Sequence, residues 1–200
     1  MKQPFGVILA GGQATRMGGG DKAMVPLKGR RVVDFVTERF VPQVDRCAIN
    51  ANGDPLRFAE FNLPVVADSI GGFQGPLAGV LAGLDWAATR GADHIVTVAV
   101  DTPYLPQDLV PQLLLAAELQ GHPIALAATV EGDKTWRHPT FGLWPVALRD
   151  DLRTVLENGV RKVVAWTDQH GAANAVFPTE PFDPFFNINT PNDLAKAGAM

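Results

Sequence analysis

A basic, glycine-rich loop near the start of the chain has the composition of a phosphate-binding loop. Arg16 lies among five glycines between Gly11 and Gly20, Lys22 follows shortly after them, and this loop directly follows the apolar run 7–10. Glycine lets backbone N–H groups approach an anion without a Cβ atom in the way. The arginine fork grips phosphate oxygens, and the compact charge of lysine bridges several of them. These residue types at this spacing therefore predict binding of a small polyanion.

Two better-known glycine motifs do not fit this loop. A Walker loop needs Ser or Thr directly after its Gly-Lys pair, whereas here Asp21 precedes Lys22 and Ala23 follows it. Residues 18–23 formally match G-x-G-x-x-A, but a dinucleotide-binding turn follows its strand at once, and this match begins several residues later. A flexible linker is the remaining alternative, but a linker does not usually place Arg and Lys among glycines after a buried strand.

Polar residues and glycines follow the ends of several predicted strands. Asn50, Asp68 and Asp101 each come after a short apolar segment, as Gly11 and Gly12 do. The carboxyl ends of parallel strands share one edge of a sheet, and ligands bind at that edge. Each residue alone is most often a turn former or a helix cap. Their convergence at one edge nevertheless indicates a binding site.

Asp101 is the candidate metal ligand. A carboxylate at the tip of a buried strand, beside a phosphate loop, suits Mg²⁺, which takes few protein oxygens and completes its shell with water and phosphate. Alternation along residues 185–190 predicts a strand that points Asn187 and Asn189 to one side and Ile188 to the other. The two amides would then share a ligand or the metal shell.

Strand and helix patterns alternate along the chain, which predicts an α/β protein: a three-layer α/β/α sandwich with a mainly parallel sheet. The predicted strands are residues 7–10, 46–49, 63–67, 94–100, 123–129, 175–177 and 185–190, with 136–144 as a hairpin arm and antiparallel addition. The predicted helices are residues 32–41, 56–61, 76–90, 108–119, 146–156 and 160–170, and one from 191 onward. In the 76–90 helix, Gly79 and Gly83 lie one turn apart, which favours close packing on the sheet over approach of a ligand.

Composition restricts the class of protein. Two hundred residues with 46% hydrophobic content favour one domain, residues 1–200. The net charge of -4 and the pI near 5.5 argue against a nucleic-acid-binding protein. A single cysteine, Cys47, excludes an internal disulfide and a multi-cysteine metal site, so a reducing cytoplasm is expected. The apolar segments are too short for a signal peptide or a membrane span.

The motifs together resemble a known family. Residues 9–22, with Leu-Ala-Gly-Gly at 9–12, Arg-Met-Gly at 16–18 and Asp-Lys at 21–22, resemble the signature L-A-G-G-x(3)-R-M-G-(x)-x-D-K of the molybdenum cofactor guanylyltransferases, the MobA-type nucleotidyltransferases. Residues 101–103 resemble the family's D-T-P segment, and residues 187–191 its closing N-x-N-T-P segment. The resemblance covers nearly the whole chain and implies a Rossmann-like nucleotidyltransferase fold.

The resemblance also implies roles for particular residues. Catalysis is assigned to Lys22, Arg16 and Asp101, and the metal to Asp101. The implied nucleotide-binding residues are Leu9, Ala10, Gly11, Gly12, Lys22, Asn50, Asp68 and Asp101. On the acceptor side, Arg137 and His138 belong to a segment that resembles the family's pterin-binding H-P-T segment, and Arg161 is placed to meet the acceptor phosphate, with Asn187 and Asn189 nearby. His138 is equally consistent with a histidine in a turn.

The implied reaction transfers GMP from GTP to molybdopterin carrying molybdenum and releases pyrophosphate, with Mg²⁺ as cofactor. The acceptor phosphate has its second pKa near 6, so it is largely ionised at pH 7 and needs no general base. Catalysis would then come from positioning and charge neutralisation. The implied partners are these two small-molecule substrates and, transiently, proteins that supply and receive the cofactor, with no nucleic acid and no membrane.

Three alternatives remain open. A cytidylyltransferase would use the same acceptor, although such relatives resemble T-A-A-G where this chain has Leu-Ala-Gly-Gly at 9–12. Other small phosphate-acceptor nucleotidyltransferases share the loop, but sugar-phosphate enzymes usually need extra length. A nucleotide-binding regulatory module without turnover would have no need for Asp101, Asn187 and Asn189 around a metal.

Overall fold

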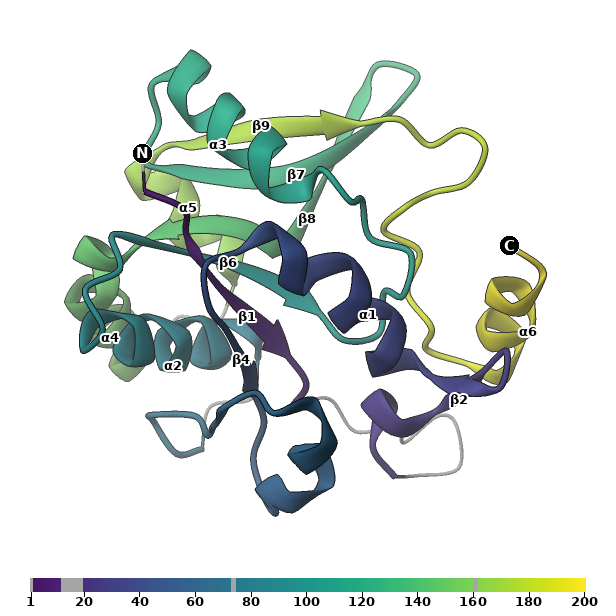
Figure 1. The fold of residues 1–200 in the computed structure, drawn as a ribbon. Helices are drawn as coiled ribbons and strands as arrows, with labels where there is room; N and C mark the ends of the chain where they lie inside the picture. Colours follow the sequence, from purple (N-terminus) through teal and green to yellow (C-terminus); the bar gives the residue numbers. More distant parts are fainter. Residues whose placement is uncertain (1, 12–19, 73–74, 160–161) are drawn as a thin grey trace.

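The computed structural model describes residues 2–11, 20–72, 75–159 and 162–200. Its centre is a seven-stranded sheet with the order β5-β4-β1-β6-β8-β7-β9 (Figure 1). The strands are β1 (Phe5–Leu9), β4 (Cys47–Asn50), β5 (Val65–Val66), β6 (His94–Ala99), β7 (Ile124–Glu131), β8 (Lys134–Pro145) and β9 (Ala172–Phe177). The apolar run of β1 lies between two parallel neighbours and is covered on both faces, which explains why its sequence does not alternate.

The sheet is mainly parallel, as predicted, and β8 is the exception. It pairs antiparallel with both β6 and β7, so the hairpin arm lies inside the sheet rather than at its edge. The amino-terminal half of β8 pairs with β7 beyond the end of β6. As a result, β7 and β8 project past the carboxyl edge of the parallel strands (Figure 1).

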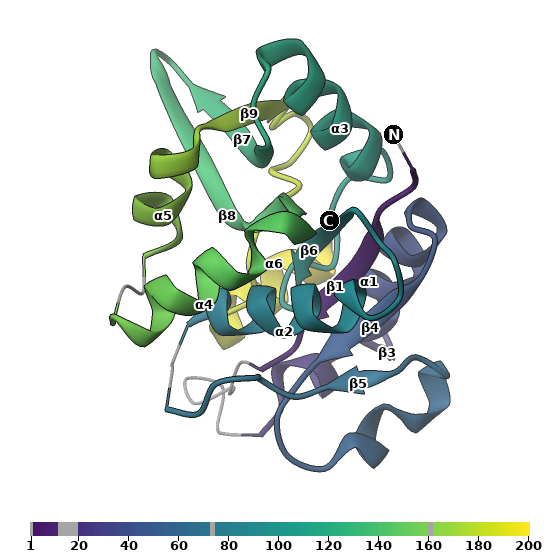
Figure 2. The ribbon, with the colours of Figure 1, turned by 90° about the vertical axis from the view of Figure 1, so that its left-hand side faces the viewer.

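Helices cover both faces of the sheet and complete the three layers (Figures 1 and 2). Apolar side chains of α1 (Val32–Phe40) and α3 (Leu109–Gln120) pack on one face. The other face carries α2 (Pro76–Ala88), α4 (Arg149–Glu157) and α5 (Val163–His170). Outside these layers, α6 (Pro191–Ala199) packs near β2 (Pro26–Leu27), which forms a hairpin with β3 (Arg30–Arg31). No described helix has the length and apolar character that a membrane crossing requires.

Short 3₁₀ helices complete the connections. They are η2 (Lys22–Met24), η3 (Val41–Gln43), η4 (Pro55–Phe61) and η5 (Val146–Leu148). Asp54 caps η4 by accepting a hydrogen bond from Leu56 N at 2.9 Å, and Pro55 occupies its first turn.

Several predicted elements need correction. Residues 185–190 form no strand. They pass the end of β6, and Ile188 N donates to the carbonyl oxygen of Asp101, which lies beyond that strand, instead of joining a ladder. The strand predicted at 63–67 shortens to β5, and the helix predicted at 160–170 is described from Val163 onward. The β2–β3 hairpin was not predicted. Its turn has positive φ at Lys28 and Gly29. Such a turn is usually marked by Asn, Asp or Gly before the glycine, and lysine at this position does not indicate it.

Close packing explains both glycines of α2. A Cβ atom at Gly83 would lie 2.7 Å from Val7 Cγ2 in β1. A Cβ atom at Gly79 would collide with Asn50 Oδ1 at the end of β4 and lie 2.8 Å from Leu9 Cδ2. The packing interpretation is confirmed for both. Gly79 differs from Gly83 because its neighbour Asn50 belongs to the candidate site.

Candidate active site

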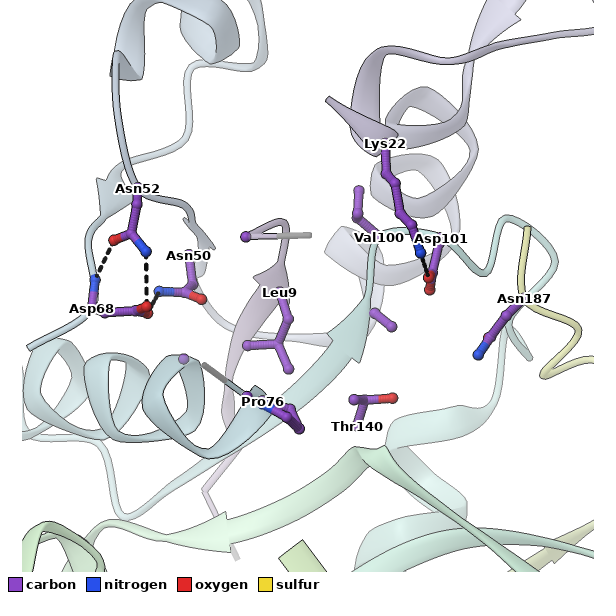
Figure 3. Close-up of a pocket in the computed structure, with 14 residues that line it drawn as sticks. Leu9, Lys22, Asn50, Asn52, Asp68, Pro76, Val100, Asp101, Thr140 and Asn187 are labelled. Atoms are coloured by element: carbon purple, nitrogen blue, oxygen red, sulfur yellow. Dashed lines mark hydrogen bonds and ion pairs between the residues drawn. The ribbon is translucent and has the colours of Figure 1, made fainter. Parts of the chain in front are cut away.

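A cavity of about 570 Å³ lies at the carboxyl ends of β1, β4 and β6 (Figure 3). Its lining consists of Leu9, Gly11, Lys22, Asn50, Asn52, Asp68, Gly75, Pro76, Gly79, Ala99, Val100, Asp101, Thr140 and Asn187. Several strand-end residues predicted from the sequence therefore line one cavity. Ala10 does not line it: this buried residue donates its backbone N–H to Asn50 O at 2.8 Å.

Lys22 and Asp101 form the charged end of the cavity. Lys22 Nζ lies 2.9 Å from Asp101 Oδ2 (Figure 3). It also lies 2.6 Å from Asn189 Oδ1. The Lys22 and Asp101 side chains are each 17% exposed, so this ion pair is sheltered but reachable from the cavity. Asp21 caps η2 by accepting a hydrogen bond from Ala23 N at 2.9 Å, which fixes the backbone that carries Lys22.

The segment 187–189 crosses the tip of β6 beside Asp101. Thr102 Oγ1 donates to Asn187 Oδ1 at 2.6 Å, while Ile188 is buried. Asn189 reaches Lys22, and Asn187 lines the cavity. The two amides thus face the site and Ile188 faces the core, as predicted, although the segment is not a strand. At the start of α6, Asp193 accepts hydrogen bonds from the backbone N–H groups of Asn189 and Thr190.

Amide and carboxylate groups form the other end of the cavity. Asn50 Nδ2 donates to Asp68 Oδ1 at 3.0 Å, and Asn52 Nδ2 donates to Asp68 Oδ2 at 2.8 Å (Figure 3). Asp68 N in turn donates to Asn52 Oδ1 at 3.0 Å. Each carboxylate oxygen has two lone pairs, so Asp68 retains capacity to accept further hydrogen bonds. Sequence reasoning missed Asn52, although it lies in the polar run after β4 and could have been included on that basis.

A bulge in β8 brings Thr140 to the cavity. The register of β7 and β8 shifts between Leu126, which pairs with Gly142, and Ala127, which pairs with His138. The extra residues include Pro139, which has no N–H for a ladder. A fully buried hydroxyl holds the bulge: Thr97 Oγ1 donates to Thr140 O at 2.9 Å and accepts from Trp144 Nε1 at 2.8 Å. Sequence reasoning named the segment containing Thr140 but not this residue.

Of the described acceptor-side residues, Asn187 lines the cavity, whereas Arg137, His138 and Asn189 do not. His138 is in β8, so the turn interpretation is wrong. Its ring stacks on Phe185 at 4.3 Å between centroids, and its Nε2 lies 3.0 Å from Thr129 Oγ1. Burial lowers the pKa of His138, and the nearby Asp183 carboxylate opposes this only in part. Arg137 is held by Asn174 Oδ1 at 2.7 Å and Asp168 Oδ1 at 2.8 Å. Gly12, Arg16 and Arg161 lie outside the described residues.

Residues 6–173 match the family model of the MobA-like NTP transferase domain. The chain belongs to this family. The chain is 51% identical over 196 residues to a molybdenum cofactor guanylyltransferase of Cereibacter sphaeroides, covering 98% of this chain and 96% of the relative. A Bradyrhizobium relative with the same name is 49% identical over 195 residues, covering 96% and 90% of the two chains. This member of the MobA-like family is therefore a nucleotidyltransferase.

Solved structures agree on the fold of this MobA-like chain. Molybdopterin-guanine dinucleotide biosynthesis protein A from Archaeoglobus fulgidus superposes with a TM-score of 0.76 at 23% identity, covering 98% of this chain and 97% of that one. A 4-diphosphocytidyl-2C-methyl-D-erythritol synthase from Anaerococcus prevotii gives a TM-score of 0.74 at 14% identity, covering 99% and 95%. The Rossmann-like nucleotidyltransferase fold is thereby confirmed.

Among the residues that the structure describes, the charged end of the MobA-like site offers hard oxygen donors to a cation. They are the Asp101 carboxylate and the amide oxygens of Asn187 and Asn189. Among the described residues, no three His, Cys, Asp or Glu side chains are grouped as a metal site. One carboxylate with neutral oxygens nearby fits Mg²⁺, which keeps several waters and binds substrate phosphates. It does not fit a site for zinc, which favours nitrogen and sulfur ligands.

Proposed function

We propose that this MobA-like protein transfers GMP from GTP to the terminal phosphate of molybdopterin carrying molybdenum. The names of its relatives at about 50% identity over nearly the full length support this reaction. The observation that carries the proposal is the two-ended cavity. One end holds Lys22 and Asp101, and the other holds Asn50 and Asp68. A nucleoside triphosphate has the matching polarity, because its phosphates are anionic and its base carries hydrogen-bonding edges.

The Asp68 end suits guanine. Guanine presents N1–H and the N2 amino group side by side, and a carboxylate accepts two such parallel hydrogen bonds in a bidentate arrangement. The corresponding edge of cytosine carries one donor beside two acceptors. Asn50 and Asn52 hold both Asp68 oxygens in place through their Nδ2 atoms. We therefore assign the base to this end and the triphosphate to the Lys22 end.

The chemistry follows from this orientation. An acceptor phosphate oxygen forms a bond to the α-phosphorus of GTP, the bond from that phosphorus to the β-phosphate bridging oxygen breaks, and pyrophosphate leaves. Lys22 neutralises charge that develops on the triphosphate. Asp101 would hold Mg²⁺, which supplies further neutralisation of the phosphate oxygens. The ion pair between Lys22 and Asp101, at 2.9 Å, holds the ammonium at the phosphate end before the nucleotide binds.

The direct experiment measures pyrophosphate release from GTP in the presence of Mg²⁺, with and without loaded molybdopterin. We expect release that depends on the acceptor. The same assay is applied to Lys22→Ala, with Lys28→Ala as its matched control. Lys28 is an exposed lysine in the β2–β3 turn and does not line the cavity. Release at the same rate without acceptor, or no release with it, would contradict the proposal.

A further inference from the structure

A partly buried ion pair joins η4 to the residue before Lys22. Arg57 Nε lies 2.7 Å from Asp21 Oδ2, and these side chains are 27% and 20% exposed. The N–H direction does not meet hydrogen-bond geometry, so the contact is an ion pair. Within the described part of the chain, neither of these two buried atoms has a hydrogen-bond partner. Because these two facing atoms are buried, removing either side chain leaves the facing atom of the other without its counter-charge.

Asp21 connects this ion pair to Lys22. One of its carboxylate oxygens faces Arg57, while the other caps η2 through Ala23 N at 2.9 Å. Lys22 is the first residue of η2. The orientation of the Asp21 carboxylate thus sets the backbone from which the Lys22 ammonium reaches Asp101. Arg57 is itself fixed, because its Nη1 donates to Asp54 O at 2.9 Å and its guanidinium lies 4.8 Å from the centre of the Phe58 ring.

We propose that Arg57 is a positioning residue that acts through Asp21 to place Lys22 at the phosphate end of the cavity. The inference rests on the proposed role of Lys22 in nucleotidyl transfer and adds a residue of η4 to it. Because η4 follows β4, which ends in Asn50, the ion pair also links the base end of the cavity to the phosphate end. Arg57 touches no reacting atom in this account.

Arg57 could act only by attaching η4 to the rest of the fold, without placing Lys22. A second ion pair of η4 allows these two roles to be separated. Glu60 Oε1 accepts from Arg31 Nη1 at 2.7 Å, and the Glu60 side chain is 68% exposed. This pair fastens η4 to the start of α1 without touching Asp21. Glu60→Gln is thus the matched control for Arg57→Met: both weaken the attachment of η4, but only Arg57→Met releases Asp21.

The test measures the dissociation constant of inorganic triphosphate by calorimetry and the kcat and KM for GTP. Inorganic triphosphate needs Lys22 but no base, so it reports the phosphate end alone. We expect Arg57→Met to weaken triphosphate binding and lower kcat/KM for GTP by about 10- to 100-fold, the usual cost of losing a residue that orients a ligand-binding group. We expect Glu60→Gln to change neither by more than about twofold.

A double-mutant cycle tests the route through Asp21. Asp21→Asn keeps an oxygen that caps η2 but removes the charge that faces Arg57. It should cause a similar loss, and the double variant with Arg57→Met should lose little more, because the two residues act as one unit. If Arg57→Met does not fold, Asp21→Asn alone carries the test. Four results would each overturn the inference. They are additive losses of triphosphate affinity in the double variant, unchanged triphosphate binding in Arg57→Met or Asp21→Asn, a loss in Glu60→Gln as large as in Arg57→Met, and no triphosphate binding by the wild type.

Failure of the proposed function has a different signature. If the wild type does not transfer GMP, but triphosphate binding weakens in Arg57→Met and not in Glu60→Gln, the reaction is wrong and the role of Arg57 stands. If the wild type transfers GMP and Arg57→Met does so equally well, the reaction stands and the role of Arg57 is wrong.

Discussion

At the residue scale, the Lys22 ammonium lies between the Asp101 carboxylate and the Asn189 amide oxygen, at 2.9 and 2.6 Å. This arrangement fixes the ammonium before any ligand arrives. Lys22→Ala should therefore lower kcat at saturating GTP by about two orders of magnitude, the usual cost of one preorganised electrostatic contact. Steady-state kinetics checks this result, with Lys28→Ala expected to behave as wild type. An unchanged kcat for Lys22→Ala would remove Lys22 from the site.

Asp101→Asn tests the proposed cation ligand. The substitution keeps the shape of the side chain and removes the charge that would hold Mg²⁺, so activity should fall sharply while the fold survives. Activity is measured across a Mg²⁺ titration, and circular dichroism records the folded state. Wild-type activity of this variant at limiting Mg²⁺ would show that the assignment is wrong.

At the scale of elements, the approach of α2 to β1 and β4 can be tested with two glycines of one helix. Gly79→Ala places a methyl group against Asn50 Oδ1 and Leu9 Cδ2, at the base end of the cavity. It should raise KM for GTP by about tenfold, since displacing Asn50 removes roughly one hydrogen bond, the one that holds Asp68 in place for the base. It should also destabilise the fold by about 1–3 kcal/mol, as overpacking does.

Gly83→Ala is the matched control. Its methyl group would meet Val7 Cγ2 at 2.7 Å and Ile95 Cδ1 at 3.0 Å, away from the cavity. It should lower the unfolding temperature in the same way and leave KM unchanged. An equal rise in KM for both variants would show that Gly79 matters only through helix packing.

The β8 element also predicts a pH dependence of stability. Burial lowers the pKa of His138 below its ordinary value of 6.5, so the folded protein favours the neutral ring. As the pH falls below about 6.5, the unfolded chain takes up a proton that the folded state does not yet bind, and stability declines until the folded pKa is passed. Above pH 6.5 this contribution is constant. His94, whose pKa is also lowered by burial, adds to the same trend.

Urea unfolding at pH 7.5 and pH 5.0 measures this effect. His138→Gln should show a smaller loss of unfolding free energy between the two pH values than wild type, because the residue no longer titrates. An identical loss in the two proteins would mean that His138 does not titrate differently in the folded and unfolded states.

At the scale of the whole molecule, the sequence predicted the parts of the site that depend on local pattern. Apolar runs followed by Asn50, Asp68 and Asp101 located the strand ends, and alternation placed the Asn187 and Asn189 side chains correctly. The position of β8 inside the sheet was not predictable in this way, because pairing order depends on contacts between segments distant in sequence. The same holds for Thr140, which a bulge brings to the cavity, and for the ion pair of Arg57 with Asp21.

A competition between nucleotides is the most direct measurement, because it tests the proposed guanine assignment in the intact site. The wild-type protein is incubated with Mg²⁺, loaded molybdopterin and equal concentrations of GTP and CTP, and the dinucleotide products are separated by mass. We expect the guanine product to exceed the cytosine product by at least about tenfold, because a mismatched buried hydrogen-bonding edge costs roughly that much in kcat/KM. Equal amounts, or an excess of the cytosine product, would contradict the guanylyltransferase assignment.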